Sequence, residues 1–490
     1  MEYEVVIGLE VHAQLLTHSK MFCGCSSDYQ GSSPNAVVCP VCMGMPGVLP
    51  VINRKAVEHV IRTGLALGCD IADNTKFDRK NYPYPDLMKG YQISQFDMPI
   101  ASGGSLTVEV DGEQRPIGIT RVHLEEDTAK LIHRTEDYGE GYSLMDVNRA
   151  GVPLMEIVGE PDIRSAAEAR QYLVDLHSVI QYIGVSIANM EEGNFRCDAN
   201  ISIRPIGDTE LGSKVEVKNM NSFRSVFRAL EFEAKRQVET LEAGGRIVQE
   251  TRGWVDDSEI TVSQRTKEYA SDYRYFPEPD LPPLVIQPEW VDSIRESLPE
   301  LPRQRMARFV SEFGLSEYDA ELLTTTKASA DYFERAVESG NAEGQDERDL
   351  AKSVSNWLLG EMARLLNQTE LTIDDVKIAP DQIVELQNLV KAGTLNSNMA
   401  KDVFERMFES GGSPEVIAEA EGLVQISDTD AVNAAVAEAI AANPQPVQDY
   451  LDGKETAIRF LVGQVMKATR GKANPQIATE MLNDKLEALR

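Results

Sequence analysis

Cysteine is scarce in this sequence, with six residues among 490. A chain of this size held together by disulfides would need far more, so the class of disulfide-stapled secreted proteins is excluded. Long hydrophobic runs are missing too, because no stretch reaches the ~18 uninterrupted apolar residues that a membrane-spanning helix needs. The first residues lack the basic-then-apolar layout of a secretory signal. We therefore expect a cytoplasmic protein without a membrane partner.

Basic residues are the second deficit. Forty-eight lysines and arginines stand against 79 acidic residues, which leaves a net charge of −31. Such a surface repels nucleic acid, so any contact with RNA must be local, and no DNA partner is expected. The simplest explanation of the acidic excess is solubility, or adaptation to a salty cytoplasm, and it involves no binding partner. One region is uneven: residues 411–452 carry eight acids and no base, whereas 453–490 carry seven bases and four acids.

The hydrophobic pattern changes once along the chain. Up to about residue 290, apolar and polar residues mostly alternate, which predicts strands, with amphipathic helices between them. After about 293, apolar spacings of three and four predict helices throughout, and the proline-rich run 276–283 marks the change. We predict an α+β fold, with a β-rich domain at 1–293, an all-helical domain at 294–412 and a small helical tail domain at 413–490.

Individual elements are predicted from the same patterns. The clearest strands are expected at 5–14, 118–125, 197–203 and 214–218, and the clearest helices of the β-rich part at 54–67, 165–183 and 222–242. In the helical part, Gly340, Gly393 and Gly411 stand where helices are expected to end, because glycine readily takes the left-handed conformation that closes a helix.

Four of the six cysteines form two close pairs, Cys23 with Cys25 and Cys39 with Cys42. Two such pairs across a short loop can supply four thiolates to a tetrahedral zinc ion, with no open position for water. The alternatives are two reduced thiol pairs or a redox-active Cys-x-x-Cys motif. We favour a structural zinc site.

Polar side chains recur on one face of the predicted strands. Alternation puts Glu10, His12 and Gln14 on the same side of one strand. On another it groups His123 with Glu125 and leaves Glu126 opposite, unless a bulge intervenes. Three further strands repeat the pattern, at Asp146 and Asn148, at Asp198, Asn200 and Ser202, and at Lys214, Glu216 and Lys218. A solvated surface explains any one strand, but the five together predict a concave polar site.

The polar face favours magnesium or manganese over a second zinc, because its donors are mostly oxygens together with histidine. Magnesium is the usual partner of nucleotide phosphates. The sequence has no GxxxxGK[ST] motif and no GxGxxG motif that opens a helix after a strand, so ATP would bind without a P-loop. Lys80, Lys89 and Arg149 are candidate partners for its charge. Nothing resembles a serine or cysteine nucleophile motif.

Seven stretches carry a family resemblance, at 6–12, 77–82, 90–95, 123–127, 196–200, 272–279 and 460–475. Through them the sequence resembles, along its whole length, the B subunit of the bacterial and archaeal Asp/Glu-tRNA amidotransferase. The resemblance implies a cradle-shaped catalytic domain, a helical domain and a tail domain related to a tRNA-binding type of module. It also implies a ligase that forms C–N bonds with glutamine as the amide donor.

The implied reaction has two steps. ATP and Mg²⁺ phosphorylate the side-chain carboxylate of Glu on tRNA(Gln) or of Asp on tRNA(Asn), and ammonia then displaces the phosphate to make the amide. The ammonia is implied to come from an amidase partner, the A subunit, which fits the missing nucleophile motif. A small C subunit is implied to complete a heterotrimer.

The same resemblance implies roles for particular residues. Mg²⁺ would be held by His12, by Glu156 and by one of the two adjacent residues Glu125 and Glu126. The alignment favours Glu126. A metal ion and a lysine offset charge on a transferring phosphoryl group, and a carboxylate can take a proton from ammonium. The other implied catalytic residues would position the phosphates, the substrate and the ammonia: Glu10, Lys80 and Asp198. The zinc would have a structural role and no part in catalysis, because some relatives lack the four cysteines.

Two other functions fit part of the pattern. One is a non-catalytic, zinc-braced scaffold that positions tRNA for another enzyme, and the other is a metal-dependent phosphohydrolase. A scaffold has no need for acids clustered beside His12. A hydrolase has no need for a long helical tail.

Three cations converge near the end of the chain, at Lys467, Arg470 and Lys472. A helix is expected at 456–470, with a one-sided apolar stripe that contains Leu461 and Val465. The cations predict a patch that contacts tRNA phosphates and carries no base information. The alternative is that they only complement the dipole at the end of this helix.

Overall fold

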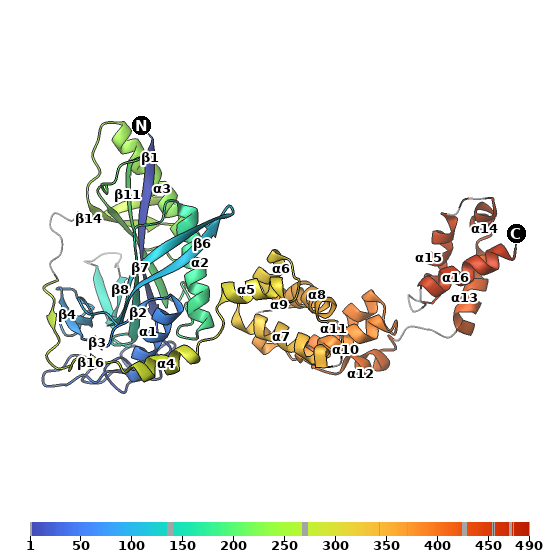
Figure 1. The fold of residues 1–490 in the computed structure, drawn as a ribbon, viewed down its shortest axis with the longest axis horizontal. Helices are drawn as coiled ribbons and strands as arrows, with labels where there is room; N and C mark the ends of the chain where they lie inside the picture. The colour runs from blue at the N-terminus through green and yellow to red at the C-terminus, as the bar shows by residue number, and fades with distance from the viewer. Residues whose placement is uncertain are drawn as a thin grey trace. The chain divides into compact units, whose positions relative to one another are not determined.

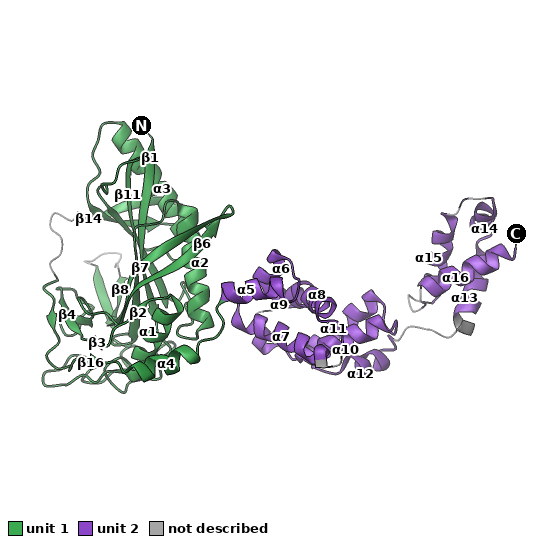
Figure 2. Cartoon of the chain, viewed as in Figure 1, with its two compact units in different colours: residues 1–301 green, residues 302–490 purple. Residues whose placement is uncertain are grey.

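The computed structural model describes residues 2–134, 141–266, 273–342, 344–369, 371–423, 429–452, 454, 456–469, 473 and 475–489. The chain divides into two compact units, residues 1–301 and 302–490 (Figure 2). Unit 1 combines sheets with helices, and the described elements of unit 2 are helical, which confirms the α+β class. Among the described helices, none has both the length and the apolar character that a membrane crossing requires.

Unit 1 is built around one large sheet (Figure 1). Its described strands pair antiparallel except for β12 with β13. In spatial order the strands are β14 (Ile260–Thr266), β13 (Glu250–Val255), β12 (Val215–Lys218), β11 (Phe195–Pro205), β1 (Tyr3–Gln14), β10 (Pro153–Gly159), β7 (Glu113–Glu126), β6 (Ala101–Val110) and β2 (Asp70–Ile71). The first strand of the chain therefore lies in the middle of the sheet, next to β10 and β11.

Smaller sheets and four helices complete the described part of unit 1. The small sheets are β15 (Phe276–Pro277) with β4 (Asp78–Asn81) and β5 (Tyr91–Ser94), β16 (Leu284–Val285) with β3 (Asn74–Thr75), and β8 (Lys130–Arg134) with β9 (Tyr142–Asp146). The helices are α1 (Arg54–Ala66), α2 (Ala166–Tyr182), α3 (Phe223–Glu242) and α4 (Pro288–Glu296). Ile294 of α4 is buried in the core of unit 1, so this unit extends past the predicted boundary at 293.

The two faces of the large sheet differ, because side chains alternate along each strand. Ile7, Leu9 and Val11 of β1 are buried in one core cluster with residues of α1, α2 and α3. Glu10, between Leu9 and Val11, and His12, which follows Val11, point to the opposite face. In Figure 1, α2 and α3 run along one side of the sheet and β4 lies on the other. Helices thus cover the apolar face of the sheet, and the opposite face carries the polar side chains.

A bulge in β7 keeps its polar residues on that second face. Between Ile119 and Arg121 the pairing with β10 gains one residue, Thr120. A bulge of one residue shifts the alternation of side chains. Ile119 and Val122 are therefore both buried in the core, while His123 lies on the polar face.

Unit 2 contains α5 (Pro302–Ser311), α6 (Glu317–Leu323), α7 (Lys327–Ala342), α8 (Glu347–Trp357), a π-helical turn (Leu358–Met362), α9 (Ala363–Gln368), a 3-10 turn (Ile373–Asp375), α10 (Pro380–Lys391), α11 (Ser397–Ser410), α12 (Pro414–Ala420), α13 (Thr429–Ala442), α14 (Pro444–Leu451), α15 (Ala457–Ala468) and α16 (Pro475–Glu487). Its buried apolar residues form two clusters, one within 309–418 and one within 432–486. We keep the predicted division of this part near residue 412 as a proposal.

Candidate active site

Three neighbouring strands place two histidines and a glutamate in a row across the polar face. His12 of β1 lies directly opposite Glu156 of β10, and Glu156 lies directly opposite His123 of β7. Opposed residues of paired strands have their Cβ atoms about 5 Å apart, so the register alone brings these side chains together. One Glu156 oxygen is 3.5 Å from His12 Nε2 and 3.3 Å from His123 Nε2.

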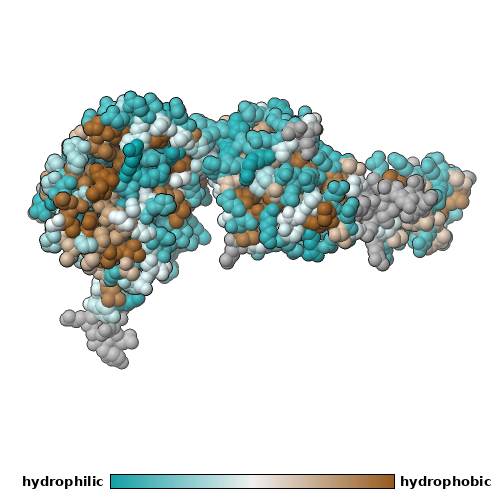
Figure 3. Space-filling view, turned by 90° about the horizontal axis from the view of Figure 1, so that it is seen from below, coloured by the Kyte–Doolittle hydropathy of each residue, from teal (hydrophilic) through white to brown (hydrophobic). Residues whose placement is uncertain are grey.

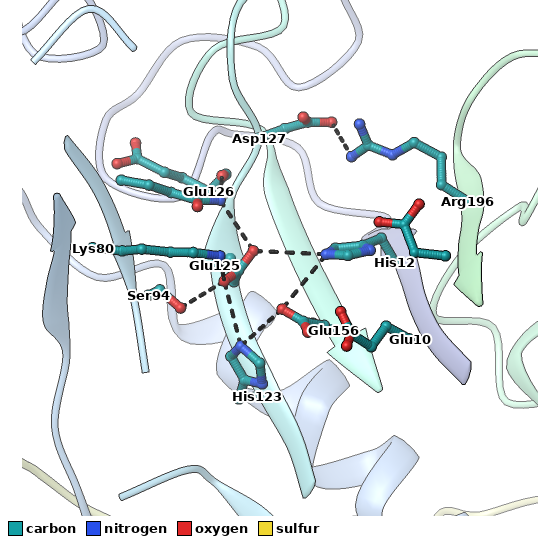
Figure 4. A network of polar contacts seen from close by, with 12 residues as sticks. Glu10, His12, Lys80, Ser94, His123, Glu125, Glu126, Asp127, Glu156 and Arg196 are labelled. Carbon is teal, nitrogen blue, oxygen red and sulfur yellow. Dashed lines mark hydrogen bonds and ion pairs between the residues drawn. The ribbon is translucent and has the colours of Figure 1, made fainter. Parts of the chain in front are cut away.

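Glu125, near the end of β7, joins this row (Figure 4). Its carboxylate accepts hydrogen bonds from Ser94 Oγ at 2.6 Å and from Gln92 Nε2 at 3.0 Å, both on β5. It also lies 4.0 Å from His12 Nε2 and 3.8 Å from Lys80 Nζ of β4. The small sheet β15-β4-β5 therefore contributes the lysine and orients the carboxylate.

A divalent cation fits between three of these residues. His12, Glu125 and Glu156 each offer one ligand atom, and these atoms lie within 4.8 Å of one another. One imidazole nitrogen and two carboxylate oxygens form a donor set that suits Mg²⁺ or Mn²⁺. The His12 side chain is 19% exposed, whereas the two carboxylates are nearly buried, so the set opens to solvent at His12.

The positive charges of His123 and Lys80 and the negative charges of Glu125 and Glu156 stabilise each other. Burial acts to lower the pKa of His123, but Glu156 and Glu125 outweigh it and raise this pKa to about 9. Burial acts to raise the pKa of Glu125, but Lys80 and His123 outweigh it and lower this pKa to about 2. The pKa of Glu156 is also well below its usual range. Both carboxylates are thus ionised at neutral pH, which is the form that binds a metal ion.

The structure separates the two adjacent glutamates. It brings Glu125, and not Glu126, to His12 and Glu156. Of the two glutamates that the resemblance left open, the geometry therefore favours Glu125, and the choice of metal ligand stays a prediction. A Glu126 oxygen accepts hydrogen bonds from Lys89 Nζ at 2.5 Å and from a backbone N–H of β5 at 3.0 Å. The reason is strand geometry, because consecutive side chains of a strand point to opposite faces.

The other expected carboxylates lie in a neighbouring row of the same face. Glu10 of β1 is directly opposite Asp198 of β11. Glu10 accepts a hydrogen bond from Asn200 Nδ2 at 2.9 Å, and Asp198 forms an ion pair with Lys218 of β12. A hollow of about 360 Å³, lined by Glu10 and Asn200 among others, lies beside this row. Such a volume is in the range that holds a small ligand.

Some residues of the site escaped the sequence analysis. Alternation put His123 on the polar face, but nothing in the pattern showed that it contacts two carboxylates. Ser94 and Gln92 lie on a separate sheet, and no local signal predicts that β5 packs against β7. Arg196 of β11, whose guanidinium is 3.0 Å from Asp127, lies in a stretch that carries the family resemblance, but no role was expected for it.

The four paired cysteines also come together. Their Sγ atoms lie within 4.8 Å of one another, and Cys42 Sγ is 3.9 Å from Cys39 Sγ. A tetrahedral site with Zn–S bonds of about 2.3 Å has S–S edges of about 3.8 Å. Hydrogen bonding with Cys23 lowers the pKa of Cys42 to about 4, and the nearby Lys20 acts in the same direction. The donor set fits a structural zinc ion.

One of the three expected tRNA-contacting residues is described by the structure. Lys467 is exposed in the last turn of α15, which buries Leu461 and Val465. Arg470 and Lys472 lie outside the described residues. The inward apolar stripe of this helix is therefore confirmed, and the patch remains a prediction.

Family models match most of the chain. The model described as the GatB/GatE catalytic domain matches residues 5–292, and the one described as the GatB domain matches residues 331–486. Curated relatives named as the B subunit of aspartyl/glutamyl-tRNA(Asn/Gln) amidotransferase are 56% identical over 488 residues in Dehalococcoides mccartyi (strain CBDB1) and 54% identical over 488 residues in Carboxydothermus hydrogenoformans. These alignments cover at least 99% of this chain and of each relative. The chain therefore belongs to the family of amidotransferase B subunits, as its motifs indicated.

Proposed function

We propose that this chain activates the side-chain carboxylate of a misacylated tRNA with ATP and then converts it to the amide. The substrate would be Glu-tRNA(Gln), Asp-tRNA(Asn) or both. One observation carries the proposal: His12, Glu125 and Glu156 converge beside Lys80 on the polar face of the region that matches the catalytic-domain family. The relatives' names support neither the non-catalytic scaffold nor the phosphohydrolase.

The first step is phosphoryl transfer. An oxygen of the substrate carboxylate attacks the γ-phosphorus of ATP, the bond to ADP breaks, and an acyl phosphate forms. Mg²⁺ held by His12, Glu125 and Glu156 would offset negative charge on the phosphates. Lys80 adds a positive charge whose position is fixed by Glu125, so little reorganisation is needed as charge develops.

The second step is amide formation. The nitrogen of ammonia attacks the acyl carbon, the C–O bond to phosphate breaks, and phosphate leaves. The nitrogen must also lose a proton, and a carboxylate of Glu10 or Asp198 in the neighbouring row accepts it. The ion pair with Lys218 holds the Asp198 carboxylate in a fixed position for this role.

Partner subunits follow from this chemistry. Nothing in the sequence resembles a serine or cysteine nucleophile motif for hydrolysing glutamine. An amidase, the A subunit, would supply the ammonia, and a small C subunit would complete the enzyme in the cytoplasm. Exposed apolar side chains support binding of a partner. Leu49 and Val51, between the cysteine pairs and α1, are 67% and 73% exposed. Figure 3 shows hydrophobic residues gathered on the face of unit 1 seen from below.

The four cysteines would bind one structural zinc ion. Elemental analysis of the purified chain should then give close to one zinc per molecule. Changing Cys39 and Cys42 together to serine should remove it, because two thiolates do not complete a tetrahedral site. A fully folded native protein without metal would contradict this assignment.

Amidation without glutamine tests the proposed reaction. Misacylated tRNA, ATP labelled at the γ-phosphate, Mg²⁺ and ammonium chloride are incubated with the enzyme complex. Labelled aminoacyl phosphate and then the amide are expected, and His12→Ala should lose both. Amide formation at the wild-type rate in His12→Ala, or without ATP, would overturn the proposal.

A further inference from the structure

Lys20 is a buried lysine beside the cysteine cluster. Its side chain lies in the interior, since the residue is 1% exposed. Nζ donates a hydrogen bond to the backbone oxygen of Val37 at 2.8 Å and lies 3.7 Å from Cys42 Sγ. No aspartate or glutamate forms an ion pair with Lys20 in the part of the chain that the structure describes. An anionic partner other than a carboxylate is therefore needed.

The backbone fixes Lys20 at this place. Its N–H donates to the carbonyl oxygen of Cys25 at 2.9 Å. Asn53, the N-cap of α1, donates from Nδ2 to the carbonyl oxygen of Lys20 at 3.3 Å. Both ends of the residue are thus tied, one to the cysteine loop and one to a helix, and the side chain has a defined direction.

The cysteine cluster can provide the missing negative charge. Four thiolates around Zn²⁺ leave two negative charges uncompensated, and a buried charge is unfavourable unless it is paired and hydrogen-bonded. The Lys20 ammonium meets this need at Cys42, which also accepts a hydrogen bond from the N–H of Cys39 at 3.1 Å. Charges of opposite sign attract strongly in such an interior.

We propose that Lys20 is a positioning residue of the cysteine site, whose ammonium offsets part of the charge of a zinc–thiolate cluster and orients Cys42 through an N–H···S hydrogen bond. This inference rests on the proposed zinc site and deepens it, and it does not depend on the amidation reaction. A lysine retained only for the packing of its methylene groups would leave zinc binding unaffected when methionine replaces it.

Reciprocity gives a sharp consequence. If the ammonium favours the zinc-loaded form, zinc must in turn stabilise the protein more when the ammonium is present. The rise in melting temperature on zinc binding is therefore larger in the wild type than in Lys20→Met. A packing defect would instead lower the melting temperatures of the loaded and zinc-free forms alike.

The test uses the full chain as wild type, Lys20→Met, Lys20→Arg and Lys55→Met. Lys55, on the surface of α1 and paired with Glu58, is the matched control. Zinc content is measured by elemental analysis, zinc affinity by competition with a colorimetric chelator, and melting temperature with and without zinc. We expect zinc affinity about tenfold lower in Lys20→Met, since groups that support metal ligands typically contribute 10- to 100-fold. Lys20→Arg should lose less, and Lys55→Met nothing.

The outcomes separate the two proposals. A wild type that binds zinc, together with Lys20→Met of equal zinc affinity and equal zinc-dependent rise in melting temperature, overturns the role of Lys20 and leaves the zinc site standing. A wild type that binds no zinc overturns both. Lys20→Gln, which keeps a donor for the Val37 oxygen but has no charge, is also expected to weaken zinc binding and decides the question if Lys20→Met does not fold.

Discussion

His123 lies between two ionised carboxylates while being 2% exposed, and this position determines how it responds to pH. A buried imidazole with no such partners loses its proton easily, because burial disfavours the charged form. Here Glu156 and Glu125 reverse that tendency. The row of the polar face is thus stabilised by charges that depend on one another, and removing one of them leaves the others unpaired.

The first prediction concerns this dependence. The pKa of His123 in the folded protein, about 9, is above its usual value of 6.5, so protonated His123 stabilises the fold. The contribution is fully present below pH 6.5 and is lost as the pH rises to about 9, and it is about 3 kcal/mol at most. Without added magnesium, the melting temperature of the wild type should fall more over this range than that of His123→Gln. Parallel pH profiles would contradict it.

The second prediction distinguishes the adjacent glutamates. Glu125→Gln should reduce phosphorylation of the aminoacyl-tRNA about a hundredfold or more, because it removes a proposed ligand of Mg²⁺ and the ion-pair partner of Lys80. Glu126→Gln, which keeps the shape of a residue bonded to Lys89, should retain most of the activity. Hydrolysis of glutamine by the partner subunit should persist to some degree in both. A larger loss in Glu126→Gln than in Glu125→Gln would restore the grouping expected by alignment.

Among the elements, the small sheet β15-β4-β5 has the most influence on the site, because β4 carries Lys80. Arg79, next to it, forms two hydrogen bonds of 2.7 Å with the buried carboxylate of Glu278, and its guanidinium lies 4.3 Å from the centre of the Tyr91 ring. A bidentate ion pair of this kind fixes the position of β4 relative to the segment that follows β15.

The third prediction tests this anchor. Arg79→Met leaves the Glu278 carboxylate buried and unpaired, which should lower the free energy of unfolding by about 3 kcal/mol. Phosphorylation should also fall, since β4 shifts and takes Lys80 with it. Calorimetry and the amidation assay measure the two effects. Arg54→Met is the control, since Arg54 stacks on the Trp290 ring at the surface, and equal effects of both variants would contradict the anchoring role.

Local sequence patterns predicted individual helices and strands better than they predicted how these elements pack together. The helix starts expected at 165 and 222 hold, because Ser165 and Ser222 accept hydrogen bonds from the first turns of α2 and α3. Gly411 ends α11 in the left-handed conformation, as expected. Gly340 does not end a helix: it lies within α7, where a side chain would collide with Leu350. That contact is between elements, and a single sequence does not show it.

The same limit explains what was found of the site. The polar faces of β1, β7 and β11 are predicted by alternation, which is a property of one strand at a time. The insertion of β10 between β1 and β7, and the bulge at Thr120, depend on pairing between distant segments. For this reason the resemblance could leave Glu125 and Glu126 open, whereas the pairing of distant strands shows that Glu125 is the one that lies beside His12 and Glu156.

At the scale of the whole molecule, a net charge of −31 and a tRNA substrate are reconciled only if the positive charge is concentrated. The final 38 residues hold seven bases after a stretch with none. Lys467 is exposed at the end of α15, on the side away from the buried stripe of Leu461 and Val465.

The fourth prediction follows from this distribution. Changing Lys467, Arg470 and Lys472 to alanine should weaken binding of all cognate tRNAs alike, because phosphate contacts carry no sequence information. The slope of log affinity against log salt concentration should fall by about 2 to 3, at roughly 0.7–0.9 per lost contact. Filter binding at several salt concentrations measures the slope. Lys485→Ala, in α16, is the control, and an unchanged slope in the triple variant would leave the tail a structural role.

The order of strands in the large sheet also bears on biosynthesis. β1 and β7 do not pair with each other, and β10, which supplies Glu156, lies between them. While the chain is emerging from the ribosome, His12 of β1 and Glu125 of β7 therefore cannot be brought together in this arrangement until β10, which pairs with both strands, has been made. A fragment that ends before β10, from a broken message or a stalled ribosome, lacks the middle of the row, and under the proposed mechanism it would not phosphorylate the substrate. The proposed phosphorylating activity thus requires a chain in which β10 has paired with both β1 and β7.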